Sequence, residues 1–245
     1  MKNKSFSYVI FFGLILIIGF FLLLIFNASF ISRIYDHNFI KKKNLLPCSF
    51  INSSLETTEG INQVSLFSQK LKNFDIAFYG DSILAKGKWN LLFPELKIVN
   101  YSGPGDTSFN VLTRLRKMTQ IPKARFAFIM VGTNDLTYNC SVEEVSKNIV
   151  DIYLEIKKRS QGKVYVLSTL ECNIFFDACI KRLSKTKALN LSLNKLSVAG
   201  KINLLDINKD LSDKSGLRLI YTYDGTHLNA NGYSVLYRNL QREVF

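Results

Sequence analysis

Histidine is scarce in this chain of 245 residues, which contains only His37 and His227. The scarcity restricts the choice of a catalytic general base, because imidazole is the side chain that most often fills this role near neutral pH. His37 lies in a polar stretch near the N-terminus, whereas His227 lies in the segment Asp-Gly-Thr-His-Leu-Asn that starts at Asp224. His227 is therefore the one candidate base in the globular part of the sequence.

Acidic residues are also few, with 19 against 32 basic residues and a formal net charge of +13. A basic surface suits an anionic polymer or an acidic lipid surface, although general solubility is the simpler interpretation. No motif typical of RNA or DNA binding accompanies the charge, so a nucleic-acid partner is not expected. Internal repeats and low-complexity tracts are absent, and the 47% hydrophobic content is enough for a full core.

The chain has only four cysteines, Cys48, Cys140, Cys172 and Cys179, and their spacing is not that of a zinc site. Neither a metal nor a cofactor is therefore expected. An even number of cysteines permits disulfides in an oxidising compartment. Cys172 and Cys179 are the closest in sequence and the first candidates for a pair, and four buried free thiols are the alternative.

One long apolar run, Tyr8–Phe26, contains no charged residue. Its length as a helix would be roughly 28 Å, close to the hydrocarbon thickness of a bilayer. A signal peptide usually has a shorter apolar core, and no small-x-small cleavage site follows, so an uncleaved anchor is favoured over a signal peptide or a buried core helix. We expect a transmembrane anchor at residues 1–30, a stalk leading into the domain at 31–70, and a globular domain at 71–245.

The orientation of this anchor follows less directly from the charges. Lysines precede the apolar run and further basic residues follow it, and a simple charge count would keep the following domain in the cytoplasm. Long domains cross membranes largely regardless of such charges. We therefore expect a single-pass membrane protein whose domain lies outside the cytoplasm, in the periplasm or on the cell surface.

The remaining sequence alternates between short apolar runs and stretches with helical periodicity. The apolar runs cover residues 75–79, 97–101, 126–131, 164–168 and 202–207. The helical stretches cover residues 109–118, 142–158 and 178–196, and a last one follows Asn229. Ser141 and Glu144 have the spacing of a capping box before the second stretch. This alternation predicts an α/β domain with a parallel sheet covered by helices on both faces.

Polar clusters that include a glycine follow the first three apolar runs, at residues 80–82, 100–103 and 132–135. Each alone is typical of a turn. Sites in open α/β sheets form at the carboxyl ends of the strands, so three such clusters would meet in one crevice. A nucleophilic serine there would need a base and an orienting acid. Asp224 and His227 have a suitable spacing, although a helix cap with a surface histidine is the alternative.

These segments, taken in order, resemble the four sequence blocks of the SGNH (GDSL) hydrolases over roughly residues 74–240. The blocks are Gly80-Asp81-Ser82, Gly103, Gly132-Thr133-Asn134-Asp135 and Asp224-x-x-His227. The stretch from Trp89 to Ser108 is similar to the branch of lysophospholipase-like and platelet-activating-factor acetylhydrolase-like esterases. The resemblance implies a flavodoxin-like three-layer sandwich with a five-stranded parallel sheet.

The resemblance also implies a role for each matching residue. Ser82 would be the nucleophile, His227 the general base and then the acid for the leaving group, and Asp224 the residue that orients His227. The backbone N–H groups of Ser82 and Gly103, with the side-chain amide of Asn134, would form the oxyanion hole.

Asp81 and Asp135 are expected to be structural, holding their loops through hydrogen bonds. Family members often have Thr or Leu and a glycine after the first block, whereas this chain continues Ile-Leu-Ala-Lys-Gly. The change lies near the expected pocket and leaves the implied catalytic residues intact.

The function implied is that of a serine esterase that hydrolyses an oxygen ester, such as an acetylated glycan or a lipid, through an acyl-enzyme on Ser82. An O-acyltransferase acting on envelope glycans would use the same residues, with a sugar hydroxyl replacing water. A non-catalytic binding module that keeps the fold would be expected to lack the serine or the histidine, and neither is missing.

Overall fold

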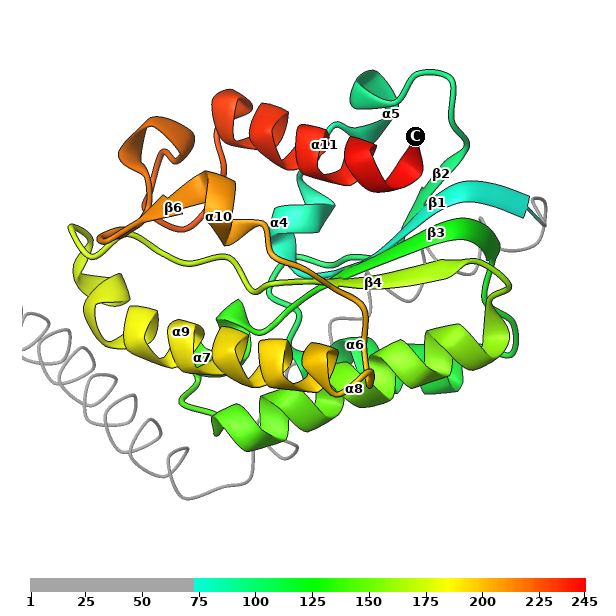
Figure 1. Ribbon diagram of the computed structural model, residues 1–245, viewed down its shortest axis with the longest axis horizontal. Coiled ribbons are helices and arrows are strands. Elements are labelled where there is room, and N and C mark those ends of the chain that lie inside the picture. The colour runs from blue at the N-terminus through cyan, green and yellow to red at the C-terminus, as the bar shows by residue number, and fades with distance from the viewer. Residues whose placement is uncertain (1–72) are drawn as a thin grey trace, which may run out of the picture. The chain divides into compact units, whose positions relative to one another are not determined.

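A five-stranded parallel sheet organises residues 73–245, the part of the chain that the computed structural model describes (Figure 1). Its strands are β1 (Asn73–Gly80), β2 (Ile98–Asn100), β3 (Lys123–Met130), β4 (Lys163–Leu167) and β5 (Leu204–Leu205). Every neighbouring pair is parallel, and the order is β2-β1-β3-β4-β5. This flavodoxin-like order reverses between β1 and β3, so the crevice beyond their carboxyl ends is where such sheets bind ligands.

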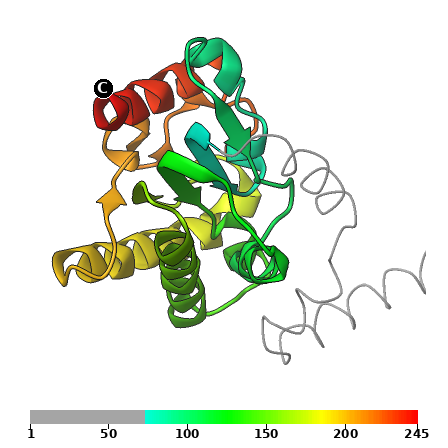
Figure 2. The ribbon, with the colours of Figure 1, turned by 90° about the vertical axis from the view of Figure 1, so that its right-hand side faces the viewer.

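Helices cover both faces of the sheet, which gives three layers (Figures 1 and 2). One layer contains α6 (Ser108–Lys117), α8 (Val142–Arg159) and α9 (Asp177–Val198). The other contains α4 (Ser82–Ala85), α5 (Trp89–Leu92), α10 (Asn208–Leu211) and α11 (Ala230–Val244). The remaining elements are α7 (Thr133–Thr137), the antiparallel pair β6 (Ser212–Asp213) and β7 (Gly216–Leu217), and the 3₁₀ helix η1 (Leu219–Tyr221).

The two faces of the sheet carry separate hydrophobic cores. Along β1, Ala77 and Tyr79 belong to the core under α6, α8 and α9, whereas Ile76 and Phe78 belong to the core under α11. Successive side chains of a strand point to opposite faces, so a strand between two helical layers must be apolar throughout. This is why the sequence shows continuous apolar runs, and the predicted parallel sheet between two helical layers is confirmed.

Helix α8 begins where the sequence predicts. The Ser141 hydroxyl accepts a hydrogen bond from the Glu144 N–H at 3.1 Å, which satisfies one of the first-turn donors. Lys157, Lys158 and Arg159 occupy the last turn, where positive charge interacts favourably with the helix dipole.

Between residues 73 and 245, no helix is both long enough and apolar enough to cross a membrane. The predicted anchor at residues 1–30 and the predicted stalk at residues 31–70 lie outside the described residues, as do His37 and Cys48.

Candidate active site

Ser82 is the first residue of α4, immediately after β1. Gly80, the last residue of β1, packs so closely on β3 that a Cβ there would lie 2.1 Å from the Met130 carbonyl oxygen. Only glycine permits this approach. The Asp81 carboxylate caps α4 by accepting from the Ile83 N–H at 3.0 Å. The Ser82 N–H lies in the first turn, where backbone donors have no partner within the helix.

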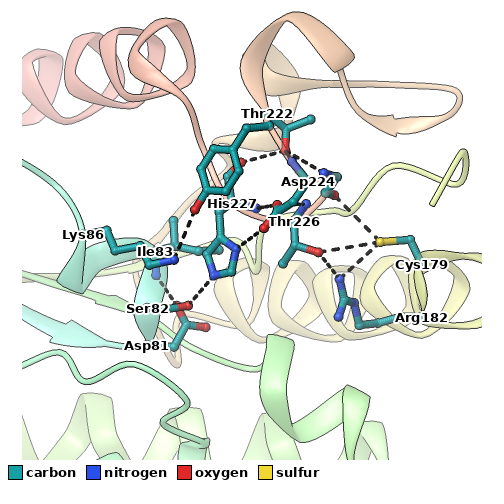
Figure 3. Close-up of polar contacts among 12 residues, drawn as sticks. Asp81, Ser82, Ile83, Lys86, Cys179, Arg182, Thr222, Asp224, Thr226 and His227 are labelled. Atoms are coloured by element: carbon teal, nitrogen blue, oxygen red, sulfur yellow. Dashed lines mark hydrogen bonds and ion pairs between the residues drawn. The ribbon is translucent and has the colours of Figure 1, made fainter. Parts of the chain in front are cut away.

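A chain of two hydrogen bonds connects Ser82 to the turn before α11 (Figure 3). The Ser82 Oγ lies 3.0 Å from the His227 Nε2. The His227 Nδ1 lies 2.7 Å from the Asp224 Oδ2. The structure therefore brings together the three residues to which the family resemblance gives catalytic roles, although 145 positions separate Ser82 from His227.

The turn that carries Asp224 and His227 is held by hydrogen bonds of its own. The second carboxylate oxygen of Asp224 accepts from the N–H groups of Thr226, at 2.9 Å, and His227, at 2.7 Å. Gly225 has a φ of +79°, and a Cβ there would lie 2.2 Å from the Phe176 ring, so the turn requires glycine. These contacts fix the carboxylate against one side of the imidazole.

The same contacts determine the charge of Asp224. Burial by itself would raise the pKa of this carboxyl, but hydrogen bonds from the backbone and ring of His227 and from the Thr226 N–H outweigh burial and hold the pKa below its ordinary value. Asp224 is therefore an anion at neutral pH.

The predicted oxyanion donors lie at the ends of β1, β2 and β3. The Asn134 Nδ2 donates to the Asp106 carbonyl at 2.8 Å, and its second hydrogen remains for another acceptor. The Gly103 N–H donates to the Gly80 carbonyl at 3.0 Å, so in this structure it is already engaged. The three donors thus come from neighbouring strand ends, but they are not equally free.

Two buried aspartates hold the loops around these donors. Both oxygens of the Asp135 carboxylate accept from the Ser108 N–H, at 3.1 and 2.9 Å, and the Ser108 hydroxyl donates to it at 2.6 Å. Burial raises the pKa of Asp135 to about 6, against the effect of these bonds. Burial raises the pKa of Asp81 to about 7, while the hydrogen bond from the Ile83 N–H lowers it and the nearby Asp135 and Asp106 carboxyls raise it.

Arg182 on α9 is a site residue that the sequence did not indicate. Its Nη2 donates to the Thr226 hydroxyl at 2.6 Å, in the turn between Asp224 and His227 (Figure 3). Its Nη1 donates to the Thr137 hydroxyl at 3.0 Å, at the end of the helix that carries Asn134. One guanidinium therefore connects the turn that carries His227 to the helix that carries Asn134.

The expected disulfide between Cys172 and Cys179 is wrong, because both are buried free thiols. Their sulfurs instead lie against the Arg182 guanidinium, with the Cys172 Sγ 3.3 Å from Nε and the Cys179 Sγ 3.2 Å from Nη2. Burial raises the pKa of Cys172 to about 12. Cys140 is disulfide-bonded.

Within residues 73–245, no group of three or more His, Cys, Asp or Glu side chains is arranged to hold a metal ion.

The sequence profile of the GDSL-like Lipase/Acylhydrolase family matches residues 78–235, which include the ends of β1, β2 and β3 and the turn of His227. The chain belongs to this family. It is a serine ester hydrolase of the GDSL-like type, as the family assignment implies.

Individual relatives of this GDSL-like hydrolase agree with the assignment. Platelet-activating factor acetylhydrolase IB subunit alpha2 of Rattus norvegicus is 30% identical over 184 residues, which cover 71% of this chain and 78% of the relative. A solved structure from Streptococcus pneumonia, described as a platelet activating factor, has a TM-score of 0.70 and 25% identity, covering 80% of this chain and 96% of that one.

A GDSL-like lipase from Bacteroides thetaiotaomicron has the same fold as this hydrolase. Its TM-score is 0.64 at 20% identity, and the superposition covers 76% of this chain and 95% of that one.

Proposed function

We propose that this GDSL-like hydrolase cleaves an oxygen ester through an acyl-enzyme on Ser82, with an acetylated glycan or a lipid-type ester as substrate. The observation that carries the proposal is the continuous hydrogen-bond chain from the Ser82 Oγ through His227 to the Asp224 carboxylate, with distances of 3.0 and 2.7 Å. A serine hydroxyl is a weak nucleophile until a base within hydrogen-bond reach removes its proton.

In the first half of the reaction, the His227 Nε2 takes the Ser82 proton as Oγ attacks the ester carbonyl carbon. The carbonyl oxygen becomes an oxyanion, which the Ser82 N–H and the second Asn134 amide hydrogen stabilise. The Gly103 N–H joins them on leaving the Gly80 carbonyl that it now contacts. Asp224 stabilises the imidazolium without taking its proton.

The protonated His227 then gives its proton to the alcohol oxygen as the bond between that oxygen and the carbonyl carbon breaks. The alcohol leaves, and the acyl group stays on Ser82. In the second half, His227 takes a proton from water, the resulting hydroxide attacks the acyl carbon, and the Ser82 Oγ leaves with the proton returned from His227.

An acetyl group is the acyl part that the comparisons favour, because the rat relative at 30% identity is an acetylhydrolase. A short acyl group also needs little apolar surface beyond the crevice at the strand ends. Acetyl esters are therefore the first substrates to test.

The direct test is the variant Ser82→Ala in the full-length chain, assayed with p-nitrophenyl acetate. We expect kcat/KM to fall by at least about 10³-fold, because removal of the nucleophile leaves only binding and oxyanion stabilisation. The control is Ser184→Ala, an exposed serine on α9 that should leave the rate unchanged. Activity of Ser82→Ala within tenfold of the unaltered protein would refute the acyl-enzyme on Ser82.

A further inference from the structure

Lys86 and Tyr223 lie beside the Ser82–His227 pair without taking part in it. The Tyr223 ring stacks on the imidazole of His227, with the ring centroids 5.9 Å apart and the planes at 8°. The Lys86 Nζ donates to the Tyr223 hydroxyl at 3.2 Å. Both side chains are exposed, Tyr223 to 58%. Together they form a solvent-facing wall, the Lys86–Tyr223 wall, next to the catalytic base.

The backbone fixes this wall relative to the reacting groups. Lys86 follows Ser82 by four residues at the end of α4, and its N–H donates to the Ser82 carbonyl at 3.0 Å. Residues four apart in a helix lie on the same face. Tyr223 directly precedes Asp224 in the turn that carries the base.

The wall adjoins the part of the site that receives the alcohol. In the proposed reaction the carbonyl oxygen points to the donors of Ser82 and Asn134, and the alcohol oxygen points to the His227 Nε2, which protonates it. Since Tyr223 covers one face of that imidazole, groups attached near the alcohol oxygen meet Tyr223 and Lys86 first.

The wall offers hydrogen-bond donors and a positive charge. A lysine ammonium has three donors, of which one goes to Tyr223, and the tyrosine hydroxyl still has its own proton to donate. Among residues 73–245, no carboxylate forms an ion pair with Lys86. The nearby Asp224 uses its two oxygens on His227 and Thr226.

We propose that Lys86 and Tyr223 form an alcohol-side subsite that binds an anionic group, a carboxylate or a phosphate, on the alcohol part of an acetyl ester. The inference rests on the proposed esterase function of Ser82. Such a subsite selects among acetyl esters by the charge of the alcohol, because charge-assisted hydrogen bonds are stronger than neutral ones.

The experiment compares matched pairs of acetyl esters with the full-length chain, by release of acetate. One pair is O-acetylated glucuronic acid and its methyl ester, in which the carboxylate is neutral. The other is acetylated glycerol phosphate and acetylated glycerol. We expect kcat/KM to be about tenfold higher for the anionic member of at least one pair, as one charge-assisted hydrogen bond allows. The pair that shows the preference distinguishes a sugar acid from a phosphate-bearing alcohol.

The variant Lys86→Met should bring the ratio of anionic to neutral kcat/KM close to one, and Tyr223→Phe should reduce it in part. The matched control is Lys88→Met, an exposed lysine two residues away whose side chain makes no capping bond to α5. This control should keep the ratio of the unaltered protein.

Three results would overturn the subsite. The first is an equal kcat/KM for the anionic and neutral members of both pairs. The second is an unchanged ratio of anionic to neutral kcat/KM in Lys86→Met. The third is a loss of this ratio in Lys88→Met as large as that in Lys86→Met, which would show a general charge effect. If neither these esters nor p-nitrophenyl acetate is cleaved in a Ser82-dependent manner, the proposed function itself fails and the subsite fails with it. Ser82-dependent hydrolysis without any charge preference refutes the subsite alone.

Discussion

Asn134 combines two tasks in one amide group at the end of β3. One hydrogen holds the Asp106 carbonyl at 2.8 Å, which fixes the direction of the other. A donor that is already oriented needs no rearrangement as negative charge develops on a substrate, which is what the proposed oxyanion role of Asn134 requires. The neighbouring Gly103 N–H, bonded to the Gly80 carbonyl, has to break a hydrogen bond before it can do the same.

Replacement of Asn134 by alanine should therefore lower kcat by about 10²- to 10³-fold with a much smaller change in KM, as expected for an interaction made mainly in the transition state. Steady-state kinetics with p-nitrophenyl acetate measure both constants. Because Asn134 also holds the Asp106 carbonyl, thermal unfolding of the variant is measured alongside. A folded variant with an unchanged kcat would remove Asn134 from the oxyanion hole.

At the level of whole elements, the site depends on α9 as a support. Arg182 reaches from this helix to the catalytic turn through Thr226 and to α7 through Thr137. The turn and α7 belong to different parts of the sequence, and this guanidinium contacts both. Movement of α9 would thus displace the base and the amide donor together.

A double-mutant cycle of Arg182→Met and Thr226→Val tests this support. Each single change should lower kcat by a larger factor than it changes KM. The loss of transition-state stabilisation in the double variant should be smaller than the sum of the two single losses, by a coupling of about 1–2 kcal/mol. Lys185→Met on the same helix is the control, because among the described residues the Lys185 ammonium donates its hydrogen bond to the exposed Asn139 and not to the turn of His227. Strict additivity would show that Arg182 and Thr226 act independently.

The sequence predicted the larger elements because their burial leaves a periodic pattern. It did not predict α4, α5, α7 or α10, since helices of four or five residues are too short to show a period. Ser82, Asp224 and His227 could be chosen because each lies in a recognisable block. Arg182 could not, because its hydroxyl partners are 44 and 45 residues away and only the folded chain brings them together. Proximity in sequence likewise suggested a bond between Cys172 and Cys179 that the fold does not make.

Across the whole molecule, the buried carboxyls make stability depend on pH. The pKa of Asp81 is about 7 and that of Asp135 about 6 in the folded protein, against roughly 4 in an unfolded chain. Between these values the folded state binds protons that the unfolded state has lost. A raised acid pKa therefore stabilises the fold at low pH, and this contribution disappears as pH rises towards 7. The lowered pKa of Asp224 has the opposite effect, but it acts below the ordinary range of an aspartate.

The free energy of unfolding should accordingly fall by about 4 kcal/mol between pH 5 and pH 8, about two thirds of it from Asp81. Urea unfolding at several pH values measures this slope. Asp81→Asn keeps an oxygen for the Ile83 N–H and should flatten the profile, leaving the smaller contribution of Asp135. A variant with the same slope as the unaltered protein would show that Asp81 does not titrate in this range.

The separation of the proposed nucleophile and base along the chain also has a consequence for biosynthesis. His227 follows Ser82 by 145 residues, so a ribosome working at about 5–20 residues per second adds the base roughly 7–30 s after the nucleophile. During that interval β1 and the serine exist without the turn that activates them. In the proposed mechanism a nascent chain would therefore carry no active esterase, and the first turnover would occur only once the last helical layer has been synthesised and packed on the sheet.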